Sequence, residues 1–337
     1  MLRRFISGCA GVGLTDEERQ FFAHARPCGL IVFDRNCRSK DQLRSLIDDF
    51  KDAVGDDRLL VLVDQEGGRV QRMKPPEWRA LPAGPRYGAL YLENAADGLE
   101  AARLIGHLVA SELAEMGINV NCVPMLDLPV EGTHAIIADR AYGVTPDVVA
   151  SLGMAVAKGH MAGGVCPVIK HLPGHGRAKA DSHLALPRVD ASLDELERTD
   201  FEPFRRLNKL PAGMTGHVVF SAIDGSTPVS TSPRAIESVI RQSIGFDGLL
   251  MSDDLSMGAL VGLLGERARA VILAGSDIAL HCNGKIDEMR RVAENSPVLD
   301  GRAEERFNAA WRATQSPKPV DQAAAEAALN RVMGAVS

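Results

Sequence analysis

The sequence lacks several features that would assign it to a specialised class of protein. Its 337 residues hold no block rich in lysine or arginine and carry a formal net charge of −6, which argues against a nucleic-acid or anionic-membrane partner. No apolar run reaches the ~18 residues of a transmembrane helix. The six cysteines form no CxxC pair and several lie in apolar runs, which predicts buried free thiols in a reducing compartment.

The chain also shows no linker, low-complexity segment or internal repeat. With 45% hydrophobic and 24% charged residues, its composition is typical of a globular protein with a sizeable core, and we predict a single domain over residues 1–337. Residues 1–14 contain two arginines, as an export signal would, but their apolar stretch is short and broken by glycines. We interpret this segment as a first strand and expect a cytoplasmic, monomeric protein without membrane contact.

What the chain does contain is a regular series of apolar, β-rich runs. Most of them are continuous rather than alternating, as expected for strands that are covered on both faces of a parallel sheet. The eight runs are RRFISG, GLIVF, LLVLVD, INVNCVPMLD, VCPVIKH, AGMTGHVVF, GLLMSDD and DIALHC.

Segments with apolar residues near helical spacing lie between these runs. The first begins with Thr15 as N-cap and Glu18 three residues on, the spacing of a capping box. The predicted helices cover residues 14–25, 40–54, 95–117, 146–164, 192–207, 233–246 and 265–275, followed by two or three C-terminal helices that include 320–334. Repeated β/α alternation predicts a (β/α)8 TIM barrel with extra C-terminal helices. A doubly wound open sheet is the alternative, which the lack of G-x-G-x-x-G after the first strand weakens.

In a (β/α)8 barrel, the chemistry lies at the C-terminal ends of the strands. Polar residues follow six of the predicted strands and would converge on one rim, which we interpret as a functional site. These residues are Asp64 with Glu66, Arg69 and Arg72, then Asp127, Lys170 with His171, His217, Asp253 with Asp254, and His281 with Asn283.

The stretch KHLPGHGRAKADSH, residues 170–183, allows three interpretations. A metal site would use its histidines and aspartate, although proline and glycines disfavour a helix and the basic residues would repel a cation. A phosphate loop would need a helix after PGHG, and no helical apolar pattern follows. In the third interpretation Asp181 and His183 point the same way in an extended loop, and the carboxylate orients the imidazole as a general acid–base. A surface pair without function fits the spacing equally well.

The sequence resembles the bacterial β-N-acetylglucosaminidases of glycoside hydrolase family three. The motifs that carry the resemblance are DQEGGRVQR, IIADRAYG, VIKHLPGHGRAKADSHLALP, MTGHVVFSAID and GFDGLLMSDDLSM. The match is closest to the single-domain cytoplasmic enzymes of peptidoglycan recycling. The resemblance implies removal of a non-reducing-terminal N-acetylglucosamine from 1,6-anhydro-N-acetylmuramic acid, with or without its peptide. We expect no counterpart of the family's second, α/β domain.

The resemblance also implies roles for individual residues. The family's nucleophile falls on Asp253, with Asp254 as a neighbour that is easily confused with it. The family's acid–base falls on His183, with Asp181 as its partner. The sugar-binding residues match Asp64, Arg72, Arg140, Lys170 and His171, and His217 matches a strand-end histidine near the nucleophile, which we group with the substrate-binding residues. Leu172 stands where a Phe or Met is common, which alters packing only.

The implied reaction proceeds through a covalent glycosyl-enzyme with net retention, and it needs neither a metal nor an organic cofactor. Two enzymes of the same family, an N-acetylglucosaminide phosphorylase and a β-glucosidase, are alternatives. A catalytically silent sugar-binding barrel is a third, from a different class. The expected partner in every case is a small sugar.

Overall fold

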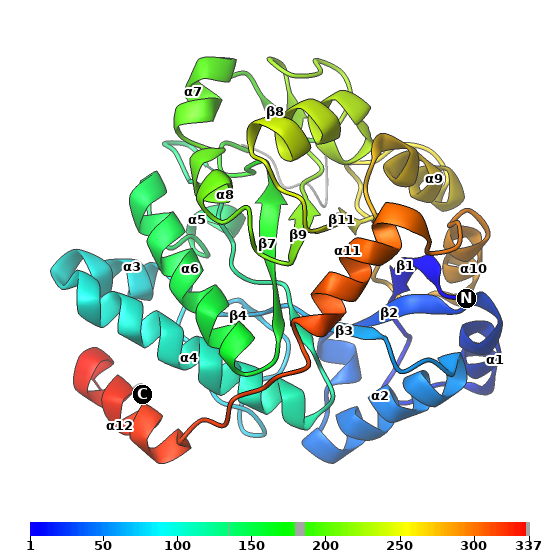
Figure 1. The fold of residues 1–337 in the computed structure, drawn as a ribbon, viewed down its shortest axis with the longest axis horizontal. Coiled ribbons are helices and arrows are strands. Elements are labelled where there is room, and N and C mark those ends of the chain that lie inside the picture. The colour runs from blue at the N-terminus through cyan, green and yellow to red at the C-terminus, as the bar shows by residue number, and fades with distance from the viewer. Residues whose placement is uncertain (134, 179–185, 335–337) are drawn as a thin grey trace.

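A closed barrel of eight parallel strands forms the centre of the molecule (Figure 1). The computed structural model describes residues 1–133, 135–178 and 186–334. Around the ring, the strands follow the order β1-β12-β11-β9-β7-β6-β3-β2. Their bounds are β1 Arg3–Ser7, β2 Pro27–Val32, β3 Leu60–Val63, β6 Val120–Asn121, β7 Cys166–Leu172, β9 Ala212–Thr215, β11 Leu249–Asp254 and β12 Ile278–His281.

Each of the eight predicted runs overlaps one of these barrel strands, so the predicted fold class is confirmed. The open-sheet alternative is wrong, because β1 pairs with both β2 and β12 and leaves no free edge. The opening segment that we interpreted as a strand is β1 itself. The strands read as continuous apolar runs because both of their faces are covered: every residue of β2, β3, β7, β9 and β12 is buried.

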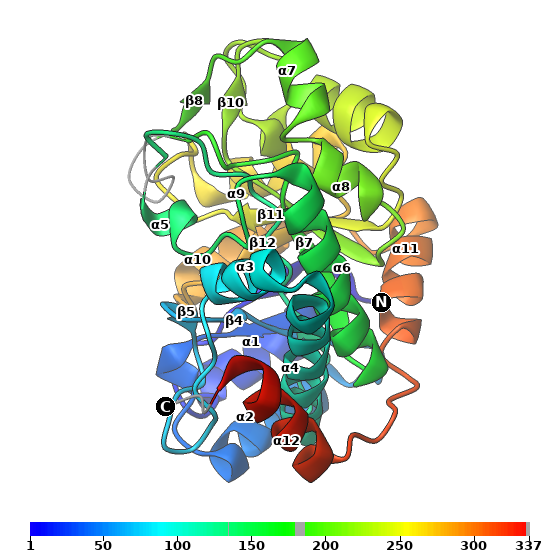
Figure 2. The same cartoon turned by 90° about the vertical axis from the view of Figure 1, so that its left-hand side faces the viewer.

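Helices surround the barrel on its outer face (Figures 1 and 2). Their bounds are α1 Asp16–Ala25, α2 Lys40–Val54, α3 Gly84–Glu93, α4 Ala95–Glu115, α5 Ala135–Ala138, α6 Pro146–Ala162, α7 Leu193–Arg198, α8 Glu202–Arg206, the π-helical segment η3 Ala235–Ser243, α9 Leu264–Ala274, α10 Ile286–Glu294, α11 Gly301–Arg312 and α12 Gln322–Met333. The capping box of α1 is confirmed: Glu18 N donates to the Thr15 hydroxyl, and Thr15 N donates to the Glu18 carboxylate.

The helix predictions are wrong at two places. Residues 192–207 form two helices, α7 and α8, because Pro203 fits only the first turn of a helix and therefore starts α8. At the break, the Asp200 carboxylate accepts hydrogen bonds from Arg177 and Thr199. Helices α3 and α5 were not predicted; α3 contains Pro85 and glycines that obscure its apolar spacing.

The extra C-terminal helices are confirmed as well. Helix α11 packs against the barrel near β11, and α12, drawn in red, lies along α4 (Figure 2). Between them, Lys318 N donates to Ala162 O at 2.7 Å and so ties the connecting segment to the end of α6. Within residues 1–133, 135–178 and 186–334, no helix combines the length and apolarity that a membrane crossing requires. All six cysteines are free; five are buried, and Cys37 is half-buried.

Two short two-stranded sheets extend the C-terminal rim of the barrel. Strands β4 (Gln65–Gly67) and β5 (Val70–Gln71) form an antiparallel hairpin directly after β3. Gly67 makes its turn possible, since it has a φ of 113° and a Cβ there would collide with the carbonyl oxygen of Pro82. Strands β8 (Arg188–Val189) and β10 (Val219–Phe220) pair in parallel after β7 and β9.

Candidate active site

A cleft of 310 Å³ lies at the C-terminal rim of the barrel, where the six predicted strand ends converge. Side chains from at least four barrel strands and from the β4–β5 hairpin line it. Six of the nine predicted site residues are among the lining residues: Asp64, Arg72, Arg140, Lys170, His171 and Asp253.

The floor of the cleft is a compact cluster of opposite charges. Lys170, only 2% exposed at the end of β7, donates from Nζ to Asp64 Oδ1 at 2.7 Å and lies 2.6 Å from Glu66 Oε1. Arg140 donates two hydrogen bonds to the Glu66 carboxylate, from Nε at 2.9 Å and from Nη2 at 2.6 Å. Two carboxylates and two cations therefore hold one another in a fixed geometry.

The cluster keeps its members ionised. Burial raises the pKa of Asp64, but Lys170 and Arg72 outweigh this effect and hold it well below the usual range. For Glu66, burial also raises the pKa, and Arg140 and Lys170 lower it to about 2. Burial lowers the pKa of Lys170, but the two carboxylates raise it above its usual value. The cleft thus presents fixed charges at neutral pH.

Arg72 reaches the cleft from the residue that follows β5. Its Nη2 donates to Asp64 Oδ2 at 3.3 Å, and its guanidinium lies over the Phe33 ring, 4.8 Å from the centroid. The buried Gln65 amide holds the hairpin in place, because its Oε1 accepts hydrogen bonds from the backbone nitrogens of Arg72 and Met73. The position of Arg72 therefore follows from the hairpin.

Asp127, in the segment that follows β6, fixes the loop that follows β7. Its fully buried carboxylate accepts from His171 Nδ1 at 2.7 Å through Oδ2. Its Oδ1 accepts from the backbone nitrogens of His171 at 3.2 Å and of His175 at 2.6 Å. Burial raises the pKa of Asp127, but the facing histidines lower it to about 2. The strand that was predicted to end at His171 extends one residue further, and β7 ends at Leu172.

The structure separates the two adjacent aspartates at the end of β11. Asp254 also lines the cleft, but its carboxylate is engaged, since it accepts hydrogen bonds from Ser256 in its own loop and from Cys282 N after β12. Asp253 lines the cleft and accepts on Oδ1 from Asp254 N at 2.8 Å. Burial raises the pKa of Asp253, but His171 and His217 outweigh this effect and lower it. An ionised carboxylate therefore faces the cavity.

His217, predicted to bind substrate, lies beneath the cleft and is fully buried. Its Nε2 donates to the Asp254 carbonyl at 3.0 Å, and its Nδ1 accepts from the Ser230 hydroxyl at 2.7 Å. Burial lowers its pKa, which favours the neutral form of the ring. Both ring nitrogens are thus committed to protein groups at the end of β11.

The remaining two predicted site residues, Asp181 and His183, lie outside the described residues. Their interpretation as an acid–base pair stays a prediction. Within the described ranges, no group of three or more His, Cys, Asp or Glu side chains is placed to hold a metal ion.

Sequence reasoning placed Glu66 and Asp127 at the rim but gave them no role. Both are central to the cluster that the structure shows: Glu66 binds Arg140 and Lys170, and Asp127 binds His171. Their roles could not be predicted because each carboxylate binds a partner from a different strand or loop. These partners lie at least 44 residues away along the chain. A carboxylate at a barrel strand end beside other such ends is the pattern that could have marked them.

Comparison with known proteins agrees with this geometry. The model of the glycosyl hydrolase family 3 N terminal domain matches residues 8–314. A β-hexosaminidase of Alkalilimnicola ehrlichii is 40% identical over 309 residues, covering 90% of this chain and 88% of the relative. A β-hexosaminidase of Neisseria gonorrhoeae is 40% identical over 292 residues, covering 85% and 80%.

Solved structures give the same result. The structure of native NagZ from Neisseria gonorrhoeae superposes with a TM-score of 0.88 at 33% identity, covering 100% of this chain and 98% of that chain. The complex of the same protein with N-trifluoroacetyl-D-glucosamine gives 0.87 at 34% identity, covering 99% and 97%. The chain belongs to glycosyl hydrolase family 3, among the glycoside hydrolases of the β-hexosaminidase type.

Proposed function

We propose that the protein is a retaining exo-β-N-acetylglucosaminidase that removes a non-reducing-terminal N-acetylglucosamine from 1,6-anhydro-N-acetylmuramic acid, with or without its peptide. The observation that carries the proposal is the cleft itself. One ionised carboxylate, Asp253, faces a cavity whose other side holds fixed cations and carboxylates suited to sugar hydroxyls. The N-acetyl sugar is supported by the N-trifluoroacetyl-D-glucosamine bound to NagZ.

In the first chemical step, an oxygen of Asp253 attacks the anomeric carbon, and the glycosidic bond breaks. His183, oriented by Asp181, gives its proton to the departing oxygen. In the second step His183 takes a proton from water, the water oxygen bonds to the anomeric carbon, and the ester to Asp253 breaks. The two inversions give net retention.

The other cleft residues bind and position the sugar. Lys170, Arg72 and Arg140 donate charge-assisted hydrogen bonds to hydroxyl groups, and Asp64 accepts them. His171 lines the cleft beside Asp253. His217 acts as a positioning residue, because its hydrogen bond to the Asp254 carbonyl steadies the end of β11. The direct sugar contact that the sequence suggested for His217 stays a prediction.

The proposal includes a cytoplasmic monomer that acts in peptidoglycan recycling. Its support is the similarity over nearly the full length of NagZ. Size-exclusion chromatography with light scattering tests the monomer, and cell fractionation tests the compartment.

The decisive assay is incubation with a purified anhydro-muropeptide, with products identified by mass. We expect free N-acetylglucosamine and anhydro-muropeptide shortened by one sugar. A second arm contains inorganic phosphate, where sugar-1-phosphate would identify a phosphorylase. A third arm offers an aryl β-glucoside, where turnover equal to that of the aryl N-acetylglucosaminide would identify a β-glucosidase. Binding without turnover in every arm would leave only a sugar-binding barrel.

A further inference from the structure

Asp127 is fully buried and is not among the residues that line the cleft, and its carboxylate accepts three N–H groups. One is the ring Nδ1–H of His171, and the other two are the backbone nitrogens of His171 and His175. A buried carboxylate with three donors is held rigidly, and its partners are held with it. Asp127 therefore fixes both the backbone and the ring of His171.

The ring contact also fixes which nitrogen of His171 is available to the cleft. Because Nδ1 donates to Asp127 at 2.7 Å, Nε2 is the nitrogen left for the cavity that the ring lines. The same ring faces Asp253: burial raises the pKa of that carboxyl, and His171 contributes to lowering it. The His171 ring thus lies between the buried Asp127 carboxylate, which it contacts, and the Asp253 carboxylate in the cleft.

We infer that Asp127 is a positioning residue that acts through His171: it holds this ring in one tautomer and one orientation, against the sugar and the reacting Asp253. The inference rests on the proposed function, since it takes Asp253 as the nucleophile. It makes the reaction depend on two Asp–His pairs, the fixed pair Asp127–His171 and the proposed acid–base pair of Asp181 and His183.

Asp127→Asn tests the inference because an amide has one acceptor oxygen where the carboxylate has two. With three N–H groups to satisfy, the variant must present its NH2 either to His171 Nδ1 or to the two backbone nitrogens. The first choice forces the opposite tautomer of the ring. The second leaves the backbone nitrogens of His171 and His175 without an acceptor and so loosens the segment that carries the ring. Either way, kcat/KM on an aryl N-acetylglucosaminide should fall roughly 10- to 100-fold.

The pH profile is the readout that a merely structural role would not move. The acidic limb of kcat/KM follows ionisation of Asp253, whose pKa is lowered, so the enzyme is active above that pKa and loses activity as the pH falls through it. If the variant loosens His171, this pKa rises and the limb moves to higher pH. The other groups that face Asp253 are unchanged in the variant: Lys170, His175, His217, Asp254, Cys122 and Cys282.

A double variant and a matched control complete the design. In a His171→Ala background, Asp127→Asn should cause no further loss beyond about 2-fold, because its route of action is gone. Asp277→Asn, a buried aspartate at the opposite end of the barrel, should lower stability but leave the pH profile unchanged. Multiplying losses in the double variant, or an unmoved acidic limb in a folded Asp127→Asn protein, would overturn the inference.

A measurement on the unsubstituted protein covers the case in which Asp127→Asn fails to fold. In 15N-histidine NMR spectra, with His171 assigned by comparison with His171→Ala, Nδ1 should carry the proton at neutral pH. An unprotonated Nδ1 would overturn the inference. An unsubstituted enzyme that is inactive on every sugar would instead refute the proposed function, so the two failures are distinguishable.

Discussion

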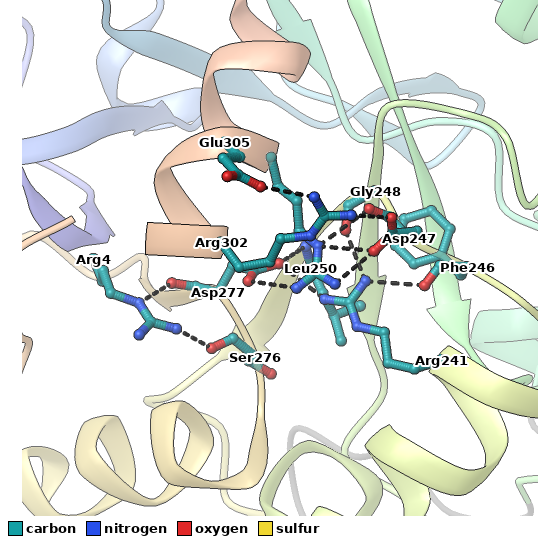
Figure 3. Close-up of polar contacts among 11 residues, drawn as sticks. Arg4, Arg241, Phe246, Asp247, Gly248, Leu250, Ser276, Asp277, Arg302 and Glu305 are labelled. Carbon is teal, nitrogen blue, oxygen red and sulfur yellow. Dashed lines mark hydrogen bonds and ion pairs between the residues drawn. The ribbon is translucent and has the colours of Figure 1, made fainter. Parts of the chain in front are cut away.

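Two clusters of charged side chains lie at opposite ends of the barrel, and they are built differently. At the N-terminal end, Asp277 precedes β12 and binds Arg241 at 2.9 Å (Figure 3). It also binds Arg306 at 3.1 Å. Its Oδ2 also accepts from Leu250 N, and its carbonyl accepts from Arg4. This base cluster joins β1, β11, β12, η3 and α11.

The arginines of the base cluster are bound to backbone oxygens as well as to carboxylates. Arg241 donates to the carbonyls of Phe246 and Gly248, and Arg4 donates to the carbonyl of Ser276. These acceptors are part of the fold and cannot be exchanged for a ligand. The base cluster is therefore a structural closure of the barrel end.

The rim cluster of Asp64, Glu66, Arg72, Arg140 and Lys170 has the other construction. Within the described residues, its cations bond side-chain carboxylates, and its members line a cavity. Each ion pair satisfies a charge that sugar hydroxyls can share or replace. The comparison teaches that buried charges contribute to stability where backbone groups are their partners. Buried charges that line a cavity are instead placed to bind a ligand.

The largest expected effect lies at the rim. Asp253→Ala should abolish turnover on every substrate, with a loss of about 10⁴-fold or more in kcat, because the variant has no nucleophile. Asp254→Ala should leave measurable activity, because its carboxylate is engaged by the backbone nitrogens of Ser256 and Cys282. Steady-state assays on an aryl N-acetylglucosaminide check both variants. A dead Asp254 variant beside an active Asp253 variant would exchange their roles.

The next largest effect is a loss of stability and is expected in the base cluster. Arg241→Met leaves Asp277 with one arginine fewer and two carbonyls without their donor, so the free energy of unfolding should fall by about 3 kcal/mol. Urea unfolding measures the loss. Affinity for N-acetylglucosamine should stay unchanged in the folded variant; a weakened affinity would show that the two clusters are not separate in function.

The next prediction concerns the affinity of the rim cluster for the sugar. Arg72→Ala and Lys170→Ala should each weaken binding of N-acetylglucosamine by about 1.5–3 kcal/mol, the contribution of a hydrogen bond to a charged group. Lys170→Ala should also lower stability, since it leaves Asp64 and Glu66 short of a partner. Titration calorimetry measures the affinity. Unchanged affinity in both variants would remove these residues from the sugar site.

The smallest effect is expected at the exposed edge of the base cluster. Arg302 binds Asp247 and Glu305, but all three side chains are more than half exposed to solvent. Arg302→Ala should lower the free energy of unfolding by less than about 1 kcal/mol and leave turnover unchanged. Urea unfolding beside Arg241→Met checks the ranking. A loss equal to that of Arg241→Met would contradict the distinction between buried and exposed members.

The sequence predicted the barrel because its strands are covered on both faces and read as continuous apolar runs. It predicted the residues of the rim from the same runs, because the C-terminal ends of parallel barrel strands all lie at one rim and place the polar residues that follow them there. Pairing across the barrel could not be predicted this way. Glu66 binds Arg140 across 74 residues and Asp127 binds His171 across 44, and neither spacing is encoded locally. The buried position of His217 also depends on a distant partner, Ser230.

The most direct test of the account traps the covalent intermediate. His183→Ala should barely slow release of nitrophenolate, which leaves without a proton, but it should slow the water step. We expect a burst of nitrophenol and a protein heavier by one N-acetylglucosamine residue. Peptide mapping should place this residue on Asp253. An adduct on Asp254, or equal slowing of bond breaking for aryl and natural substrates without burst or adduct, would contradict the account.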